Sequence, residues 1–172
     1  MTSIRKDSFP WFWVVLALLI VLAAIPRFAS CDYSLPYVDH PDEPNKYLAA
    51  RVWRGLYEHP TEEYYKGYPP GYLVVSYIAQ VIGEPLGVVG LSETVGMMRY
   101  VAVIVNLATM LFIGLAGRKA GGDLAGWIAA ALWGISPLVL EVGYYAIQDP
   151  FVYFWVTLAL LLAVEALSLI HI

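Results

Sequence analysis

The chain has 172 residues, of which 60% are hydrophobic and only 14% are charged. A mean hydropathy of +0.65 excludes an ordinary soluble domain and favours a bundle of membrane helices. The small net charge of −4 gives no basis for binding nucleic acid, and the single cysteine excludes an internal disulfide framework.

The first apolar run, Trp11 to Ile25, follows the cations Arg5 and Lys6. Positive charge ahead of a first span places the N-terminus in the cytoplasm, so we expect an uncleaved span at about residues 10–29. A cleaved signal peptide has the same layout, and the residues before Cys31 approach a lipoprotein cleavage box. That alternative stays open.

Three later apolar runs come close to the roughly 20 residues that cross a hydrocarbon core of ~30 Å. They cover about residues 98–117, 124–145 and 150–166. Residues 30–97 begin as a polar and aromatic stretch, and we expect them to form an outward loop with amphipathic helices at the membrane interface. The predicted fold is therefore an all-α, polytopic membrane helix bundle.

The apolar segment from Gly71 to Gly90 either crosses the membrane or lies along its surface. Arg118 and Lys119 occupy a short loop, where the preference of cations for the cytoplasmic side is strong. A crossing at Gly71 to Gly90 would place both cations outside, so we expect this segment at the interface. Asp149, between the last two spans, then faces outward with the acids of the first loop.

Those acids belong to the motif His40-Pro41-Asp42-Glu43-Pro44. Proline is favoured in a first helical turn and acids at a helix N-terminus, so a helix is expected to start here and to end near Gly55 or at His59-Pro60. Leu48, Val52 and Leu56 recur every four positions, which predicts an amphipathic helix on the membrane surface.

Asp42 and Glu43 have two interpretations. In the simpler one they cap this helix; in the other they do chemistry, which the flanking prolines and a second acid on the same face favour. Asp149 likewise either caps the span that Pro150 begins or belongs to a site. Arg99, at the head of the second span, either binds phosphate or reaches the lipid headgroups.

The order of these motifs resembles the GT-C membrane glycosyltransferases, specifically the aminoarabinose lipid A transferase and protein O-mannosyltransferase group. The resemblance runs from about Phe9 to Leu162. Its features are the first-loop Pro-Asp-Glu, the pair Lys46-Tyr47, the Pro-rich return Tyr68-Pro69-Pro70-Gly71-Tyr72, Arg99, and Ala146 to Phe151 ahead of Phe154-Trp155. Two departures are an extra Asn45 and Gly67-Tyr68 in place of a Glu-Lys pair.

This resemblance implies transfer of a sugar, with inversion, from a polyprenyl-phosphate carrier to a lipid, polysaccharide or protein acceptor outside the plasma (inner) membrane. Asp42 matches the first-loop aspartate, the base or acceptor-orienting group, and the implied catalytic set is Asp42, Glu43 and Asp149. The residues expected to bind substrate and carrier phosphate are Lys46, Tyr47, Arg51 and Arg99. Whether a divalent metal binds at Asp42 and Asp149 stays open, and no other cofactor is implied.

Residues 1–166 are then the N-terminal part of a GT-C transmembrane domain, expected to be inactive alone, and residues 167–172 read like a non-native tail. Two other functions remain as alternatives. A transporter needs polar groups in mid-span, where Asn106 and Thr109 lie; a non-catalytic scaffold needs none. Glu141, near the outer end of the third span, is either inert or functional.

Overall fold

The computed structural model describes residues 10–56 and 70–170, all of them in helices, turns or irregular segments without a strand. Arg5, Lys6, Gly67 and the start of the Pro-rich return lie outside these residues, as does the end of the predicted tail. The all-α prediction is confirmed. Within these described ranges, three helices are long and apolar enough to cross a membrane: Trp11–Ala29, Leu91–Ile135 and Asp149–Leu167.

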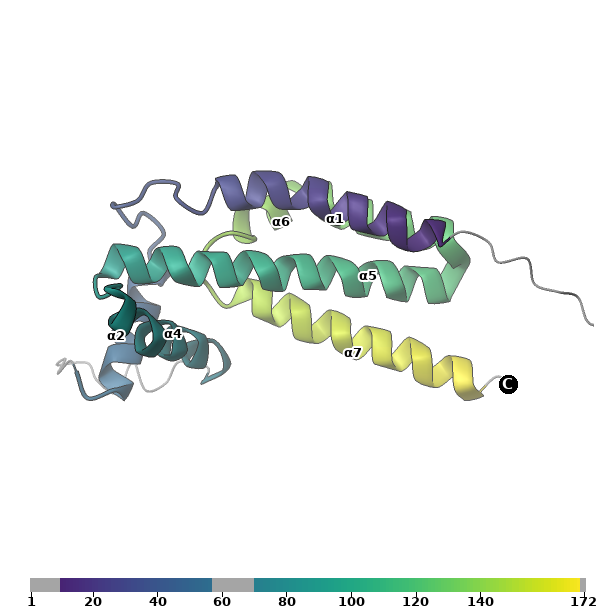
Figure 1. Ribbon diagram of the computed structural model, residues 1–172. Coiled ribbons are helices and arrows are strands. Elements are labelled where there is room, and N and C mark those ends of the chain that lie inside the picture. Colours follow the sequence, from purple (N-terminus) through teal and green to yellow (C-terminus); the bar gives the residue numbers. More distant parts are fainter. Residues whose placement is uncertain (1–9, 57–69, 171–172) are drawn as a thin grey trace, which may run out of the picture.

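The long helices run side by side, and two shorter ones lie at one end of them (Figure 1). Along the chain the order is α1 (Trp11–Ala29), α2 (Asp42–Trp53), α4 (Pro70–Gly83), the short 3₁₀ helix η1 (Glu84–Leu86), α5 (Leu91–Ile135), α6 (Pro137–Val142) and α7 (Asp149–Ile170). In Figure 1, α2 and α4 occupy the left-hand end of the bundle.

Helix α5 is broken at Gly121 and Gly122, the turn expected between the second and third spans. Gly122 has φ +82° and ψ −175°, a conformation that glycine alone adopts readily. The two halves then pack closely, because a Cβ atom on Gly126 would lie 2.6 Å from the carbonyl oxygen of Gly114. Small residues at such a contact let two backbones approach. A second break, before Pro137, separates α5 from α6.

The segment expected at the interface is α4, which has 14 residues. At 1.5 Å per residue it is about 21 Å long, too short for a hydrocarbon core of ~30 Å. It packs on α2 and on the start of α5 instead. The buried residues at this end include Tyr72 of α4, with Val95 and Met98 of α5.

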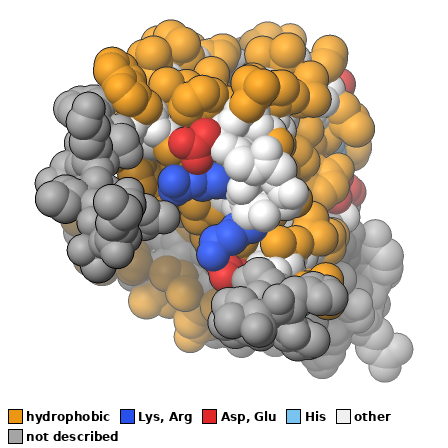
Figure 2. Space-filling model, turned by 90° about the vertical axis from the view of Figure 1, so that its right-hand side faces the viewer, with side chains coloured by type: hydrophobic (Ala, Val, Ile, Leu, Met, Phe, Trp, Pro, Cys, Tyr) orange, Lys and Arg blue, Asp and Glu red, His pale blue; other side chains and the backbone are white. Residues whose placement is uncertain are grey.

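Opposite charges gather at the other end of the bundle, where α5 breaks. Figure 2 shows this end, with basic and acidic side chains at its centre and hydrophobic side chains around them. Arg118 pairs with Asp123 at 2.8 Å, and Lys119 pairs with Glu165 at 2.9 Å. The two cations and the acidic motif therefore lie at opposite ends of the molecule, the arrangement that the charge argument requires.

Candidate functional site

Helix α2 starts at the acidic motif, with Asp42 as its first residue. Its N-cap is Pro41, and no side-chain hydrogen bond caps it. The helix ends at Trp53, within two residues of the nearer predicted end. Of the predicted apolar face, Val52 is buried against α4 and Leu56 is 45% exposed, while Glu43 and Lys46 are buried as well.

Glu43 forms a buried ion pair with Arg99 of α5. Nε of Arg99 donates to Oε1 of Glu43 at 2.8 Å, and Nη2 donates to Oε2 at 2.7 Å. Both side chains are fully buried. Parallel N–H···O bonds between a guanidinium and a carboxylate are among the strongest and most directional contacts in proteins.

The same two side chains also bind three backbone groups, in two segments of the chain. Nη1 of Arg99 donates to the carbonyl oxygens of Cys31 and Tyr33 at 3.1 and 2.6 Å. Oε1 of Glu43 accepts from the backbone N–H of Ala146 at 2.7 Å. We call Glu43, Arg99 and this N–H the outer-loop tether, since together they join the segment after α1, helix α2, helix α5 and the connection into α7.

Lys46 lies one turn after Glu43 and is only 2% exposed. Burial lowers the pKa of its ammonium group, while the nearby carboxylates of Asp42 and Asp149 act to raise it. Both acids are therefore close enough to act on the charge of one amino group, and the prediction that Asp42 and Asp149 share a membrane face stays a prediction. We call these three residues the Lys46 centre; both carboxylates are partly exposed.

Two side chains of helix α4 donate hydrogen bonds to the backbone of α2 at the Lys46 centre. Oγ of Ser76 donates to the carbonyl oxygen of Lys46 at 3.1 Å, and Nε2 of Gln80 donates to that of Tyr47 at 3.0 Å. Sequence reasoning treated Ser76 and Gln80 only as interruptions of an apolar run. Their spacing of four, which places both on one face of a helix, was the signal for a polar contact.

The other two predicted binding residues lie together but bind protein groups. The hydroxyl of Tyr47 donates to the carbonyl oxygen of Val89 at 3.3 Å. Arg51 donates to that hydroxyl at 3.4 Å and to the carbonyl oxygen of Leu56 at the same distance. Tyr47 and Arg51 thus join α2 to the segment before α5.

Two buried polar atoms near the tether have no hydrogen-bond partner among the described residues: the hydroxyl of Tyr72 and Oε1 of Gln148. Burial, with a smaller effect of Glu43, raises the pKa of Tyr72 well above its usual value, so the hydroxyl keeps its proton. Its ring lies 5.0 Å from that of Phe151, edge to face. A free donor and a free acceptor here suit a ligand rich in hydroxyl groups.

A divalent metal does not fit the residues that the structure describes. No group of three or more histidine, cysteine, aspartate or glutamate side chains is placed there to hold an ion. Hard divalent cations take six or more oxygen ligands, and the ammonium of Lys46 beside Asp42 and Asp149 would repel one.

No protein-family model, no curated protein sequence and no solved structure matches this chain.

Proposed function

We propose that this chain carries the acidic part of the active site of a multi-pass membrane glycosyltransferase. The enzyme moves a sugar from a polyprenyl-phosphate carrier to an acceptor at the outer face of the plasma membrane. The observation that carries the proposal is the Lys46 centre, in which Asp42 and Asp149 act electrostatically on one buried ammonium group. The resemblance of the motif order to GT-C enzymes supplies the reaction.

The candidate residues fall into two groups, according to whether other protein groups already occupy their hydrogen-bonding atoms. Both oxygens of Glu43 accept hydrogen bonds from protein donors, and Arg99 is enclosed by the protein. We therefore assign Glu43 and Arg99 to positioning. Asp42 is partly exposed and is the better base, because its carboxylate has room to meet an acceptor.

In the proposed step the acceptor hydroxyl attacks the anomeric carbon of the sugar, and Asp42 takes its proton. The bond between that carbon and the carrier phosphate breaks, and its electron pair stays on the phosphate oxygen. The ammonium of Lys46 stabilises the charge that develops there. Asp149 orients the acceptor or the sugar, with Tyr72 and Gln148 as further hydrogen-bonding groups. At a helix N-terminus a carboxylate is favoured in its ionised form, so positioning contributes more than basicity.

Sugar transfer in membranes tests this assignment, with a protein that carries the complete GT-C transmembrane domain, including these residues, as the wild type. The donors are polyprenyl phosphates that carry a radiolabelled pentose or hexose. Asp42→Asn should lower the rate about 100-fold or more, the usual contribution of a general base, and Lys46→Gln should lower it as well. The matched control is Asp32→Asn, an exposed acid of the same loop, which should keep the rate.

The competing functions give different results. A scaffold or a transporter predicts no transfer by the wild type from any of these donors. Transfer that survives in both Asp42→Asn and Asp149→Asn would mean that the Lys46 centre is not catalytic.

A further inference from the structure

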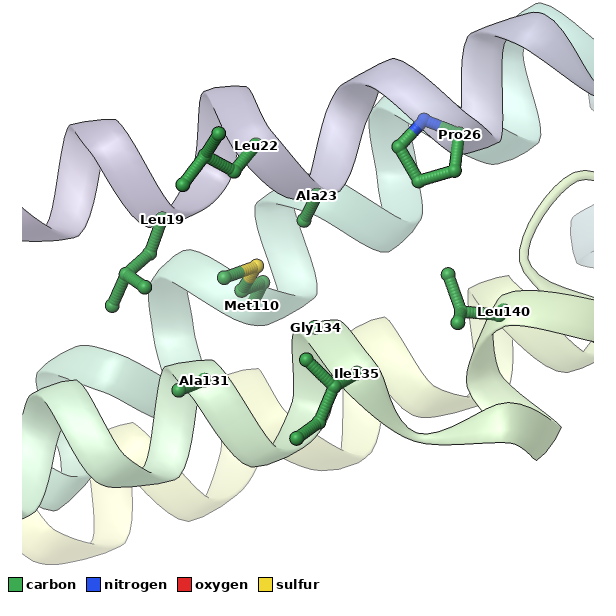
Figure 3. Close-up of a pocket in the computed structure, with 9 residues that line it drawn as sticks. All are labelled: Leu19, Leu22, Ala23, Pro26, Met110, Ala131, Gly134, Ile135 and Leu140. Atoms are coloured by element: carbon green, nitrogen blue, oxygen red, sulfur yellow. The ribbon is translucent and has the colours of Figure 1, made fainter.

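A second candidate site lies within the bundle, between α1 and the second half of α5. It begins as an apolar trough of about 300 Å³, drawn in Figure 3. Ala23 and Pro26 of α1 form one wall, Ala131 and Gly134 of α5 form the other, and Leu140 of α6 lies at the end nearer the outer loop. This volume is at the lower end of the roughly 300–1,000 Å³ typical of small-ligand pockets.

The trough continues into a partly open chamber of about 280 Å³, because Pro26 and Leu140 line both cavities. The chamber's other walls include the charged Arg27 and Glu141, and Tyr144. An apolar trough that opens into a chamber with charged walls suits an amphiphilic ligand, with its apolar tail in the trough and its polar headgroup in the chamber.

Arg27 is fixed in the wall of this chamber with one donor group unused. It is 1% exposed. Nε donates to Oδ1 of Asn106 at 2.9 Å, and Nη1 donates to the carbonyl oxygens of Ala23 and Gly134 at 2.8 and 3.2 Å. Nη2 is buried and has no partner within residues 10–56 and 70–170. Leaving a charged donor unpaired in a membrane helix is costly, so its natural complement is an anion.

Glu141 places the opposite charge on the same chamber. Its side chain is exposed and forms no ion pair within the described part of the chain. A simple anion would be attracted by Arg27 and repelled by Glu141. A headgroup that contains both a phosphate and a primary amine is attracted by both residues.

We propose that the trough and chamber bind one aminophospholipid. The phosphate accepts from Nη2 of Arg27, the ammonium of the headgroup pairs with Glu141, and one acyl chain occupies the trough. The proposed lipid site includes no residue of the Lys46 centre, so a failure of either proposal would leave the other unaffected.

Native mass spectrometry of the whole chain tests the proposal, after reconstitution with equal amounts of phosphatidylethanolamine and phosphatidylglycerol. The wild type should retain phosphatidylethanolamine about fivefold better, the effect of about 1 kcal/mol. Glu141→Gln should abolish this preference. Arg27→Gln should weaken retention of both lipids about tenfold or more, as expected for loss of a charge-assisted hydrogen bond.

Two further variants keep the test decisive if Arg27→Gln fails to fold. Ala131→Phe fills the trough without changing a charge and should release both lipids. The control, Arg118→Gln, changes an arginine at the opposite end of the bundle and should retain the wild-type preference. Equal retention of the two lipids by the wild type, a preference for phosphatidylglycerol, or unchanged retention in Ala131→Phe would overturn the proposal.

Discussion

Replacement of Glu43 by glutamine tests whether one buried ion pair holds the outer loop to the bundle. Glutamine keeps the shape of the side chain but leaves the guanidinium of Arg99 without its counter-charge, and both groups are fully buried. Removal of one partner from a buried pair costs about 3–5 kcal/mol, mostly because the remaining charge is stranded. This free energy destabilises the state in which the outer loop is docked on the bundle, relative to the undocked state.

Cys31 reports on that docking. It is the only cysteine in the chain, its side chain is fully buried, and its carbonyl oxygen accepts from Arg99. Burial, with a smaller effect of Asp32, raises the pKa of the thiol to about 11, so the docked thiol reacts slowly with a maleimide. A loss of about 3–5 kcal/mol should raise the labelling rate roughly 150- to 5,000-fold where labelling follows the open population.

Two variants decide how the result is interpreted. Glu84→Gln removes an exposed partner of Arg54 and should leave Cys31 protected. Glu43→Leu combined with Arg99→Met should recover part of the protection, because no charge is then stranded. A labelling rate in Glu43→Gln within about threefold of the wild type, less than 1 kcal/mol, would refute the role of the pair.

Three other predictions address the turn, the buried lysine and the membrane orientation. Gly122→Ala should lower the free energy of unfolding by about 1–3 kcal/mol, because a residue with a side chain is strained at a φ of +82°. The exposed control Ala120→Ser should leave that free energy unchanged. Thermal unfolding in detergent measures both variants. Burial lowers the pKa of Lys46, so between that value and the ordinary 10.5 the unfolded chain binds the extra proton. The wild type should therefore gain stability relative to Lys46→Met as pH rises from about 7 to about 10, and a flat difference would contradict the burial. In a cysteine-free background, an impermeant maleimide should label Tyr37→Cys on intact cells, but Arg118→Cys only after lysis; equal labelling would refute the assigned orientation.

Local signals predicted the helices well. Proline and acids predicted the start of α2 at Asp42, and the gap between two apolar runs, with Arg118 and Lys119 in it, predicted the turn within α5. Each of these features depends on a few adjacent residues. The same holds for Pro137, which cannot continue a helix without loss of a hydrogen bond and therefore begins α6.

The pairing of side chains was not predictable in this way. Arg99 was expected to meet a phosphate, and the structure pairs it with Glu43, 56 positions earlier. Periodicity along one helix carries no information about which group on another helix faces it. For the same reason the apolar spacing of Leu48, Val52 and Leu56 predicted an amphipathic helix but not the burial of Glu43 and Lys46, which contact with α4 and α5 produces.

The tether and the Lys46 centre depend on each other physically. The ammonium group of Lys46 stays at 2% exposure only while α2 remains docked on the bundle. The ion pair that Glu43, one turn before Lys46, forms with Arg99 holds α2 there. If α2 undocked, Lys46 would become hydrated and its two carboxylate neighbours would separate. Because Ala146 binds to Glu43 just before α7 begins, the same contact also sets where Asp149 lies. In the proposed chemistry Glu43 therefore acts without contacting a substrate, since it holds in place the segments that carry Asp42 and Asp149.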